Sequence, residues 1–197
     1  MKQAFLLLGI MTVIVYAGAY IAFSRKAEAP VLQDTNSSIA MSLSLTSPAF
    51  EEGGLIPSRY TCDGENISPG LTIENVPTGT KSLVLVMDDP DIPDTVKQAR
   101  GIEKFDHWAV YNIPADTSEI AEGATVGELG LNSRGDLSYV GSCPPDREHR
   151  YFFRLYALSG MLTFAEAPSL DELELAAQGI LLEKATLMGR YKRVKLP

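Results

Sequence analysis

The chain contains few histidines and cysteines, the side chains with pKa values nearest neutral pH, and little tryptophan. Among 197 residues it has two histidines, two cysteines and one tryptophan. It lacks the Gly-x-Ser-x-Gly turn of serine hydrolases and the His-Glu-x-x-His helix of zinc proteases. It also lacks the close His or Cys spacings that are typical of zinc sites. We therefore expect a protein that is not an enzyme and that uses no cofactor and no metal. Turnover of phosphoesters or amides that depends on His107 or His149 is the enzymatic alternative.

Basic residues are in the minority. The chain has 17 Lys and Arg against 25 Asp and Glu, which gives a net charge of −8. Affinity for nucleic acid comes mainly from basic side chains that neutralise phosphates, so the composition argues against a nucleic-acid partner. The length fits one domain with a full core.

The N-terminus carries a long run that is uncharged and mainly apolar. Residues 4–23 contain no charged side chain, and twenty helical residues span roughly 30 Å, the thickness of a bilayer core. We predict a transmembrane anchor at 1–25, a linker at 26–40 and a folded domain at 41–197. The domain is expected to face the extracytoplasmic side. A cleaved signal peptide, which would leave a secreted or periplasmic protein, is the alternative because small-x-small sites occur within the run, at 17–19, and after it, at 27–29.

The remainder of the chain is patterned mainly as strands. Period-2 alternation or short apolar runs bounded by turn residues predict strands at 41–46, 71–76, 81–87, 108–113 and 151–158. Near the end, Ser169 and Glu172 form a capping box. The residues that follow at helical spacing are Leu170, Leu173, Ala177, Ile180, Leu181 and Lys184. The pattern predicts a mainly β, antiparallel domain with a C-terminal α-helix.

Both histidines occur in polar clusters. Asp89-Pro90-Asp91 follows an apolar run, which taken alone is an ordinary turn. His107 begins the next strand, where alternation would place Trp108 on the opposite face, in the core. His149 and Tyr151 are two apart on a third strand, and so are expected to share a face. We therefore predict one pocket, formed by Asp89, Asp91, His107, His149 and Tyr151.

Such a pocket suits a small anion. Imidazoles beside carboxylates are oriented and have their cationic form favoured. The histidines and the tyrosine hydroxyl would contact the anion, while the aspartates would orient the histidines or meet an ammonium group. Phosphate joined to an amine matches this mixed polarity. Zinc is the competing ligand for two His and two Asp.

The two cysteines allow two interpretations. Cys62 and Cys143 could form one disulfide, which an extracytoplasmic domain would permit. Alternatively, each is a buried free thiol that packs as a small apolar side chain.

Read in order, several stretches resemble the phosphatidylethanolamine-binding protein family, in its bacterial Raf-kinase-inhibitor-like (YbhB/YbcL) branch. The matching stretches are 60–69, 88–93, 107–114, 130–135, 139–145 and 149–152. The resemblance implies two antiparallel β-sheets and a small cavity that binds anions such as a phospholipid headgroup phosphate. The positions that match the family's pocket are Asp89, Asp91, Pro93, His107, Pro144, His149 and Tyr151.

The resemblance also leaves a second function open. Some members inhibit serine proteases or kinases, so a protein target contacted through 91–106 and 141–148 is the alternative to a headgroup. Two departures from the family pattern, Val140 and Ser142, suggest a differently shaped pocket loop because a β-branched residue takes positive φ only at a cost. Lys97, Arg100 and Lys104 form either a cationic lip or a solvated loop. We further predict that His149→Ala abolishes headgroup binding and leaves the fold intact.

Overall fold

The computed structural model describes residues 41–193. The predicted anchor at 1–25 and linker at 26–40 lie outside the described residues. Within residues 41–193, no helix is both long enough and apolar enough to cross a bilayer.

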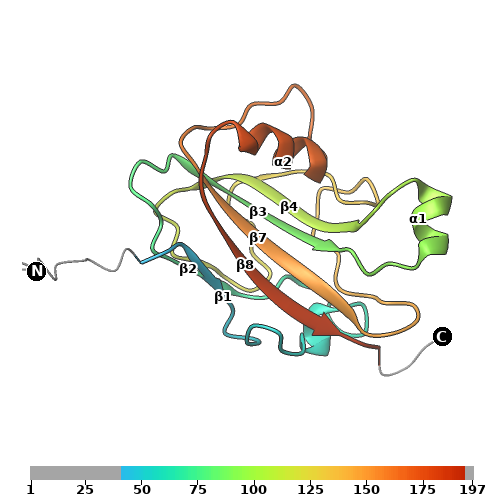
Figure 1. The fold of residues 1–197 in the computed structure, drawn as a ribbon. Coiled ribbons are helices and arrows are strands. Elements are labelled where there is room, and N and C mark those ends of the chain that lie inside the picture. Colours follow the sequence, from blue (N-terminus) through green and yellow to red (C-terminus); the bar gives the residue numbers. More distant parts are fainter. Residues whose placement is uncertain (1–40, 194–197) are drawn as a thin grey trace, which may run out of the picture. The chain divides into compact units, whose positions relative to one another are not determined.

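Two antiparallel sheets form the framework (Figure 1). The small sheet has the order β1-β2-β5 and the large sheet the order β6-β4-β3-β7-β8. Two-sheet, mainly β architecture is thus confirmed. The strands are β1 (Ser44–Thr46), β2 (Leu71–Glu74), β3 (Ser82–Asp89), β4 (Phe105–Pro114), β5 (Glu119–Ile120), β6 (Glu128–Leu129), β7 (His149–Leu158) and β8 (Leu181–Tyr191).

Strand β3 lies at the centre of the large sheet and is buried along its whole length. Leu83, Leu85 and Met87 point into the core between the two sheets. Val84 and Val86 point to the other face, where helix α2 (Leu170–Gln178) covers them. Burial on both faces explains why this strand is a continuous apolar run instead of an alternating one.

The C-terminal helix is shorter than predicted. The capping box of Ser169 and Glu172 is present, but α2 ends at Gln178. Residues 181–191, which we expected to begin inside the helix, form β8 and pair with β7 along its length. From Ala185 onward every second residue of β8 is buried, and this period of two outweighs the helical spacing that Leu181 and Lys184 happen to continue.

Helix α1 (Asp94–Arg100) was not predicted. None of its residues is buried, so it carries no apolar stripe from which a helix could be recognised. It ends at Gly101, which adopts φ +66°. Figure 1 shows α1 at the end of the large sheet, beside the ends of β3 and β4. The other helical element within residues 41–193 is the short 3-10 turn η1 (Ser58–Tyr60).

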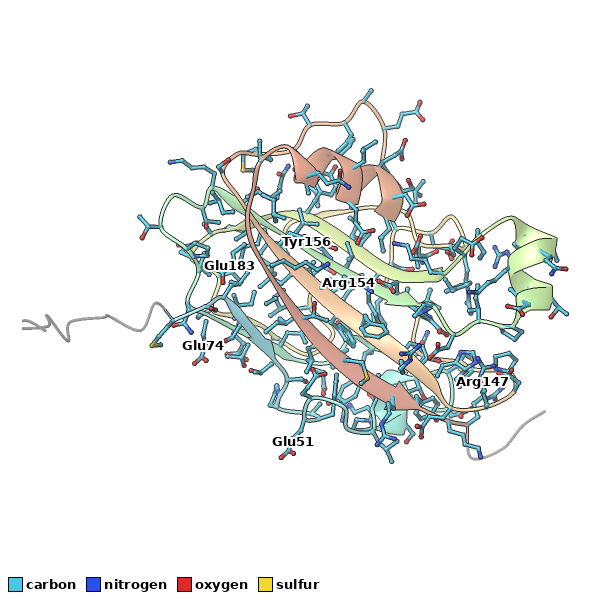
Figure 2. All side chains as sticks on the ribbon, viewed as in Figure 1. Glu51, Glu74, Arg147, Arg154, Tyr156 and Glu183 are labelled. Atoms are coloured by element: carbon cyan, nitrogen blue, oxygen red, sulfur yellow. A yellow bond between two sulfur atoms is a disulfide. The ribbon has the colours of Figure 1, made fainter. Side chains whose placement is uncertain are left out.

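A polar network lies on the face of the large sheet that α2 covers. Lys104 Nζ is 2.8 Å from Glu174, 3.4 Å from Asp171 and 4.0 Å from Asp106. Tyr156 also donates a hydrogen bond to Glu174 (2.5 Å). Tyr156 is labelled on β7 in Figure 2. Lys104 is therefore engaged in this network and does not form a lip over a pocket.

Asp106 is the carboxylate of this network whose negative charge is unfavourably buried, so Asp106→Asn is expected to stabilise the protein. Burial raises the pKa of Asp106 to about 6, and Lys104 only partly opposes this. The pKa of Asp106 is higher in the folded protein than in the unfolded chain. The free energy of unfolding therefore falls as pH rises from the unfolded pKa to the folded pKa, and the whole loss remains above pH 6. We expect the substitution to raise the free energy of unfolding by about 1–2 kcal/mol at pH 8.

Urea unfolding of wild type and Asp106→Asn at pH 8 and at pH 4 checks this expectation. The gain should be present at pH 8 and should disappear near pH 4, where Asp106 is protonated. A variant that is less stable than wild type at pH 8 would show that the ion pair with Lys104 outweighs the burial penalty.

Candidate functional site

A cavity of about 300 Å³ opens where β3 ends and β4 begins. Three of the seven predicted site residues line it, namely Asp89, Pro93 and His107. Much of the remaining wall is apolar and is formed by Ile92, Val96, Phe105 and Val140. The cavity is larger than a single phosphate needs, so it has room for a small organic ligand.

The other four predicted residues do not line the cavity. They are Asp91, Pro144, His149 and Tyr151. Their side chains surround or support it, as the contacts of three of them show. Pro144 is buried beside the wall residue Cys143.

His149 lies between two carboxylates. Its Nδ1 is 2.7 Å from Asp89 Oδ2 and its Nε2 is 2.8 Å from Asp146 Oδ1, and its side chain is fully buried. Burial lowers the pKa of His149, but the two carboxylates together outweigh it and raise the pKa above its ordinary value. Both ring nitrogens are used, so His149 holds Asp89 in place and has no nitrogen left for a ligand.

Asp91 is paired with an arginine and not with a histidine. Arg150 donates from Nε (2.8 Å), from its terminal nitrogen (2.7 Å) and from its backbone N–H (3.0 Å) to the Asp91 carboxylate. These hydrogen bonds lower the pKa of Asp91 to about 2. The expectation that Asp91 orients a histidine is therefore wrong, since this fork of hydrogen bonds occupies both carboxylate oxygens.

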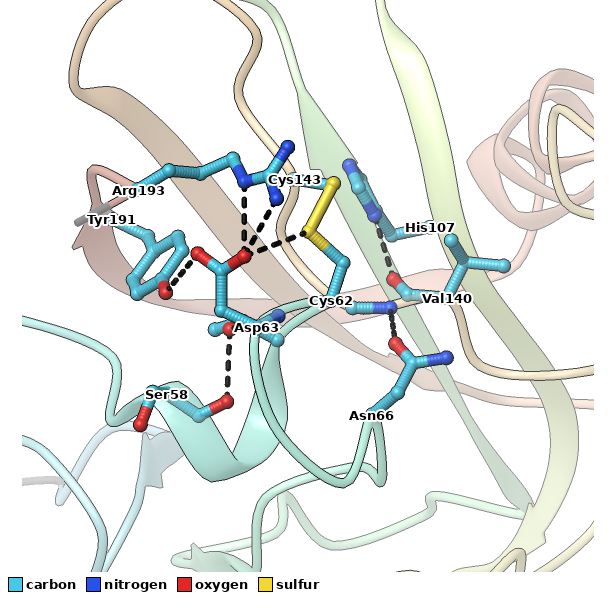
Figure 3. Close-up of a disulfide and its surroundings, with 11 residues drawn as sticks. Ser58, Cys62, Asp63, Asn66, His107, Val140, Cys143, Tyr191 and Arg193 are labelled. Carbon is cyan, nitrogen blue, oxygen red and sulfur yellow. Dashed lines mark hydrogen bonds and ion pairs between the residues drawn. A yellow bond between two sulfur atoms is a disulfide. The ribbon is translucent and has the colours of Figure 1, made fainter. Parts of the chain in front are cut away.

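His107 faces the cavity with one nitrogen. Its Nδ1 is 2.6 Å from the Val140 carbonyl oxygen and must donate to it, because a carbonyl only accepts. Burial lowers the pKa of His107 to about 4. In the neutral ring, Nε2 therefore carries a lone pair, and Figure 3 shows that nitrogen pointing away from Val140.

His107 and Trp108 do not alternate as the strand pattern predicted. Met87 pairs with Trp108 while Asp88 pairs with Asp106, so β4 has an extra residue at this point. The bulge turns both rings to the core side of the sheet, where His107 contacts Tyr151 and Trp108 contacts Tyr139. It places the imidazole at the cavity instead of on the α2 face.

Tyr151 lies behind His107. The two rings are 5.3 Å apart, edge to face, and Tyr151 is fully buried. Its hydroxyl has no hydrogen-bond partner among the described residues, and the same is true of the buried Ser142 hydroxyl. Burial raises the pKa of Tyr151 well above its usual range. Tyr151 was predicted to contact an anion. It does not line the cavity, and its ring packs against the imidazole of His107.

Two arginines at the cavity were not among the predicted site residues. Arg100, from α1, lines the cavity, and its guanidinium donates to the Ser133 carbonyl (2.7 Å). Arg134 lines it from the loop between β6 and β7. The Asn132 side chain fixes this loop by accepting the Arg134 backbone N–H (2.8 Å). Arg100 was one of three candidates for a lip, whereas Arg134 lies within a stretch that matched the family but carried no expected role.

A disulfide secures the remaining wall (Figure 3). Cys62 and Cys143 are bonded, with Cα atoms 5.4 Å apart, which decides between the two interpretations of the cysteines. Next to it, Gly141 donates its backbone N–H to Asn66 Oδ1 (2.8 Å). A Cβ at Gly141 would lie 2.5 Å from that oxygen, so the close approach requires glycine.

Val140 does not strain this wall. Among the described residues, positive φ outside glycine occurs only at Asn66, Asn75 and Asn112. The expected distortion from a β-branched residue with positive φ is therefore absent.

The cavity brings charged and hydrogen-bonding groups together along an apolar wall. Within residues 41–193, no group of three or more His, Cys, Asp and Glu is placed to hold a metal ion. What the cavity offers is two guanidinium groups, one imidazole lone pair and one carboxylate along an apolar wall. These groups suit hydrogen bonding and charge pairing with a small polar ligand.

Comparison with known proteins assigns the family. Residues 46–192 match the family model "Phosphatidylethanolamine-binding protein". A UPF0098 protein of Chlamydia pneumoniae is 43% identical over 152 residues, which are 77% of this chain and 99% of that protein. A UPF0098 protein of Methanothermobacter thermautotrophicus is 44% identical over 158 residues, 77% of this chain and 99% of that protein.

Solved structures agree. The crystal structure of a putative phosphatidylethanolamine-binding protein homolog from Chlamydia trachomatis has a TM-score of 0.72 and 41% identity, covering 77% of this chain and 98% of its own. The crystal structure of Escherichia coli YbcL, described as a member of the mammalian family, has a TM-score of 0.69 and 26% identity, covering 78% and 99%. The resemblance noted in the sequence is thereby confirmed, and the chain belongs to the phosphatidylethanolamine-binding protein family.

Proposed function

We propose that the domain is a non-catalytic binding module whose cavity takes small ligands that carry a phosphate, phospholipid headgroups included. The observation that supports this proposal most directly is the pairing of the arginines. Six of the eight arginines within residues 41–193 have a carboxylate partner within 4.0 Å. The two that have none there, Arg100 and Arg134, are the two that line the cavity.

Unpaired guanidinium groups are notable on this protein because carboxylates are abundant. The chain has a net charge of −8, and most cations have partners available. Two arginines without carboxylates at one opening make a local positive field that attracts anions against the overall charge. Guanidinium groups also match the geometry of phosphate oxygens and can bind them through two parallel hydrogen bonds.

The volume of the cavity and the description of a related protein both fit a ligand that carries a phosphate. A volume of about 300 Å³ with an apolar wall can hold a phosphate and a short carbon chain. The Chlamydia trachomatis relative is described as a putative phosphatidylethanolamine-binding protein homolog, which supports a headgroup as the phosphate source.

Arg134→Gln is expected to weaken the binding of ethyl phosphate about tenfold, because one charge-assisted hydrogen bond at a partly solvated opening is lost. Arg134 is exposed, so the fold should tolerate the change. Calorimetric titration of the wild type and the variant measures the effect.

The matched control is Arg59→Gln, which removes an arginine that is also exposed but does not line the cavity. Affinity should be unchanged in this control. Equal affinity of wild type and Arg134→Gln would remove Arg134 from the site, and no binding of ethyl phosphate by the wild type would contradict the proposed function.

A second candidate function is inhibition of an enzyme through the surface around the cavity. The loop 145–148 is exposed and begins two residues after the disulfide-bonded Cys143, and α1 has no buried residue. A loop that is anchored by a disulfide loses less entropy on binding a partner than an unanchored loop does. A panel of serine proteases assayed with stoichiometric protein tests this, since an inhibitor slows at least one of them and a headgroup module slows none.

A further inference from the structure

A tight turn between β6 and β7 presents the tripeptide Arg134-Gly135-Asp136. All three residues are exposed, and Leu137, which follows them, is 49% exposed. Surface turns that are held by a rigid scaffold are where proteins commonly place residues that bind a partner. The turn therefore offers a cation, an anion and an apolar side chain in succession to anything that approaches it.

Asn132 fixes the backbone of this turn. Gly135 donates its N–H to the Asn132 carbonyl (2.9 Å), and Asn132 donates its N–H to the Asp136 carbonyl (3.0 Å). The buried Asn132 side chain also accepts the backbone N–H groups of Arg134 (2.8 Å) and Asp136 (3.1 Å). Gly135 has φ +83°, which a residue with a Cβ adopts only at a cost. The turn is thus held in one shape before any partner binds, which lowers the entropy cost of binding.

Both charged side chains of the turn are available. Within residues 41–193, the hydrogen bonds of Arg134 and Asp136 are made by their backbones. In the same range neither side chain is within 4.0 Å of a group of opposite charge, whereas the other cavity-distant arginines are paired. A free guanidinium and a free carboxylate therefore stand two residues apart, separated by a residue without a side chain.

We propose that this turn is the ligand of a receptor whose binding face holds a divalent cation beside an acidic pocket. The Asp136 carboxylate completes the oxygen coordination of the receptor's cation, because Mg²⁺ and Ca²⁺ take carboxylate oxygens as ligands. Arg134 enters the acidic pocket, where its guanidinium forms two parallel hydrogen bonds with a carboxylate. Such receptors act outside cells, and the sequence predicts that the domain faces the extracytoplasmic side.

The cation has to come with the receptor. Ca²⁺ takes about 6–8 oxygen ligands, of which one carboxylate supplies at most two. In the part of the chain that the structure describes, no group of three or more His, Cys, Asp and Glu is placed to hold a metal ion. Asp136 is therefore suited to fill one open position of a cation that a partner already holds.

This contact does not depend on the proposed phosphate binding. Arg134 lines the cavity, but Asp136 does not. A substitution at Asp136 therefore separates the two functions, and Asp136→Glu is the sharpest one because it keeps the charge and moves the carboxylate by one methylene group.

The test measures binding of the full chain to an immobilised integrin ectodomain, a receptor that recognises Arg-Gly-Asp turns through a bound cation. Surface plasmon resonance in buffer with Mg²⁺ is expected to show saturable binding that is lost when EDTA removes the cation. Asp136→Glu is expected to weaken binding at least about tenfold, since the longer side chain misplaces the carboxylate at the cation.

The matched control is Asp116→Glu, which changes an exposed aspartate in another turn that does not follow Arg-Gly. Affinity for the receptor should be unchanged in this control, and Asp136→Glu should still bind ethyl phosphate as the wild type does. No binding by the wild type, or equal binding by the wild type and Asp136→Glu, would overturn the receptor site and leave the phosphate-binding function standing.

Competition by short peptides tests the same contact without any substitution. The peptide Gly-Arg-Gly-Asp-Ser is expected to displace the wild-type chain from the integrin ectodomain, and Gly-Arg-Gly-Glu-Ser at the same concentration is not. Binding that neither peptide displaces would show that the chain contacts the receptor elsewhere, and so would overturn the role of this turn.

Discussion

Replacing Cys62 and Cys143 by serine is expected to lower the free energy of unfolding by about 4 kcal/mol, because the disulfide closes a long loop in the unfolded chain. The bonded residues are 81 positions apart. For a domain of this size such a loss corresponds to a fall in Tm of about 10 °C. Thermal unfolding of the double variant, and of the wild type with and without reductant, measures it.

The backbone conformation of the cavity wall should be retained in the double variant. Cys62 donates its backbone N–H to the Ser142 carbonyl (3.2 Å), and Tyr139 donates its hydroxyl to the Tyr60 carbonyl (2.7 Å). These bonds do not depend on the sulfur atoms. Retained binding of ethyl phosphate at 15 °C, together with the lower Tm, is therefore the expected pair of results. A fall in Tm of under about 2 °C would show that the unfolded chain is already constrained in this region, so that the cross-link adds little.

Strands were predictable where the sequence pattern had a single interpretation. The runs at 81–87 and 151–158 correspond to β3 and β7. Strand β3 is buried throughout, and burial alternates along the first part of β7. Residues 181–191 were misassigned at their start because Leu181 and Lys184 fit both a helix and a strand. What decides between the two is the ladder to β7, a contact between segments that no local pattern contains.

The sequence predicted which strands carry the site residues and which residues share a face. It did not predict which side chains reach the cavity and which lie behind another side chain. Alternation correctly put His149 and Tyr151 on one face, yet whether a side chain reaches the cavity depends on what lies in front of it. For His149 that is Asp89, and for Tyr151 it is His107. The bulge in β4 and the position of Arg134 likewise depend on tertiary structure, since neither has a local signal stronger than a polar loop.

His149→Ala is the second substitution with a large expected effect, and that effect is on stability. The imidazole is fully buried and Asp89 is 3% exposed, so the alanine variant leaves a buried carboxylate without its charged partner. Breaking a buried pair in this way typically costs about 3–5 kcal/mol. One hydrogen bond to Asp89, from the Asp91 backbone N–H (2.8 Å), remains and favours the lower end. The expectation from sequence that this substitution spares the fold is therefore revised.

The pH dependence distinguishes a charged pair from simple loss of packing. Because the folded pKa of His149 is raised, its contribution is complete below the unfolded value of about 6.5 and is lost as pH rises through the folded pKa. Urea unfolding of wild type and His149→Ala across this range should show the largest difference in stability near pH 6 and a smaller difference at higher pH. A difference independent of pH would mean that His149 acts by filling space.

Asp146→Asn is the matched control, because it removes the other carboxylate that contacts His149. The Asp146 side chain is 41% exposed, so solvent already screens this pair and the loss of stability should be much smaller. If the Asp146 variant lost as much stability as His149→Ala, the outer carboxylate would be the important partner and Asp89 would not need His149. Because Asp89 lines the cavity, the comparison also tests whether His149 supports a residue of the cavity wall.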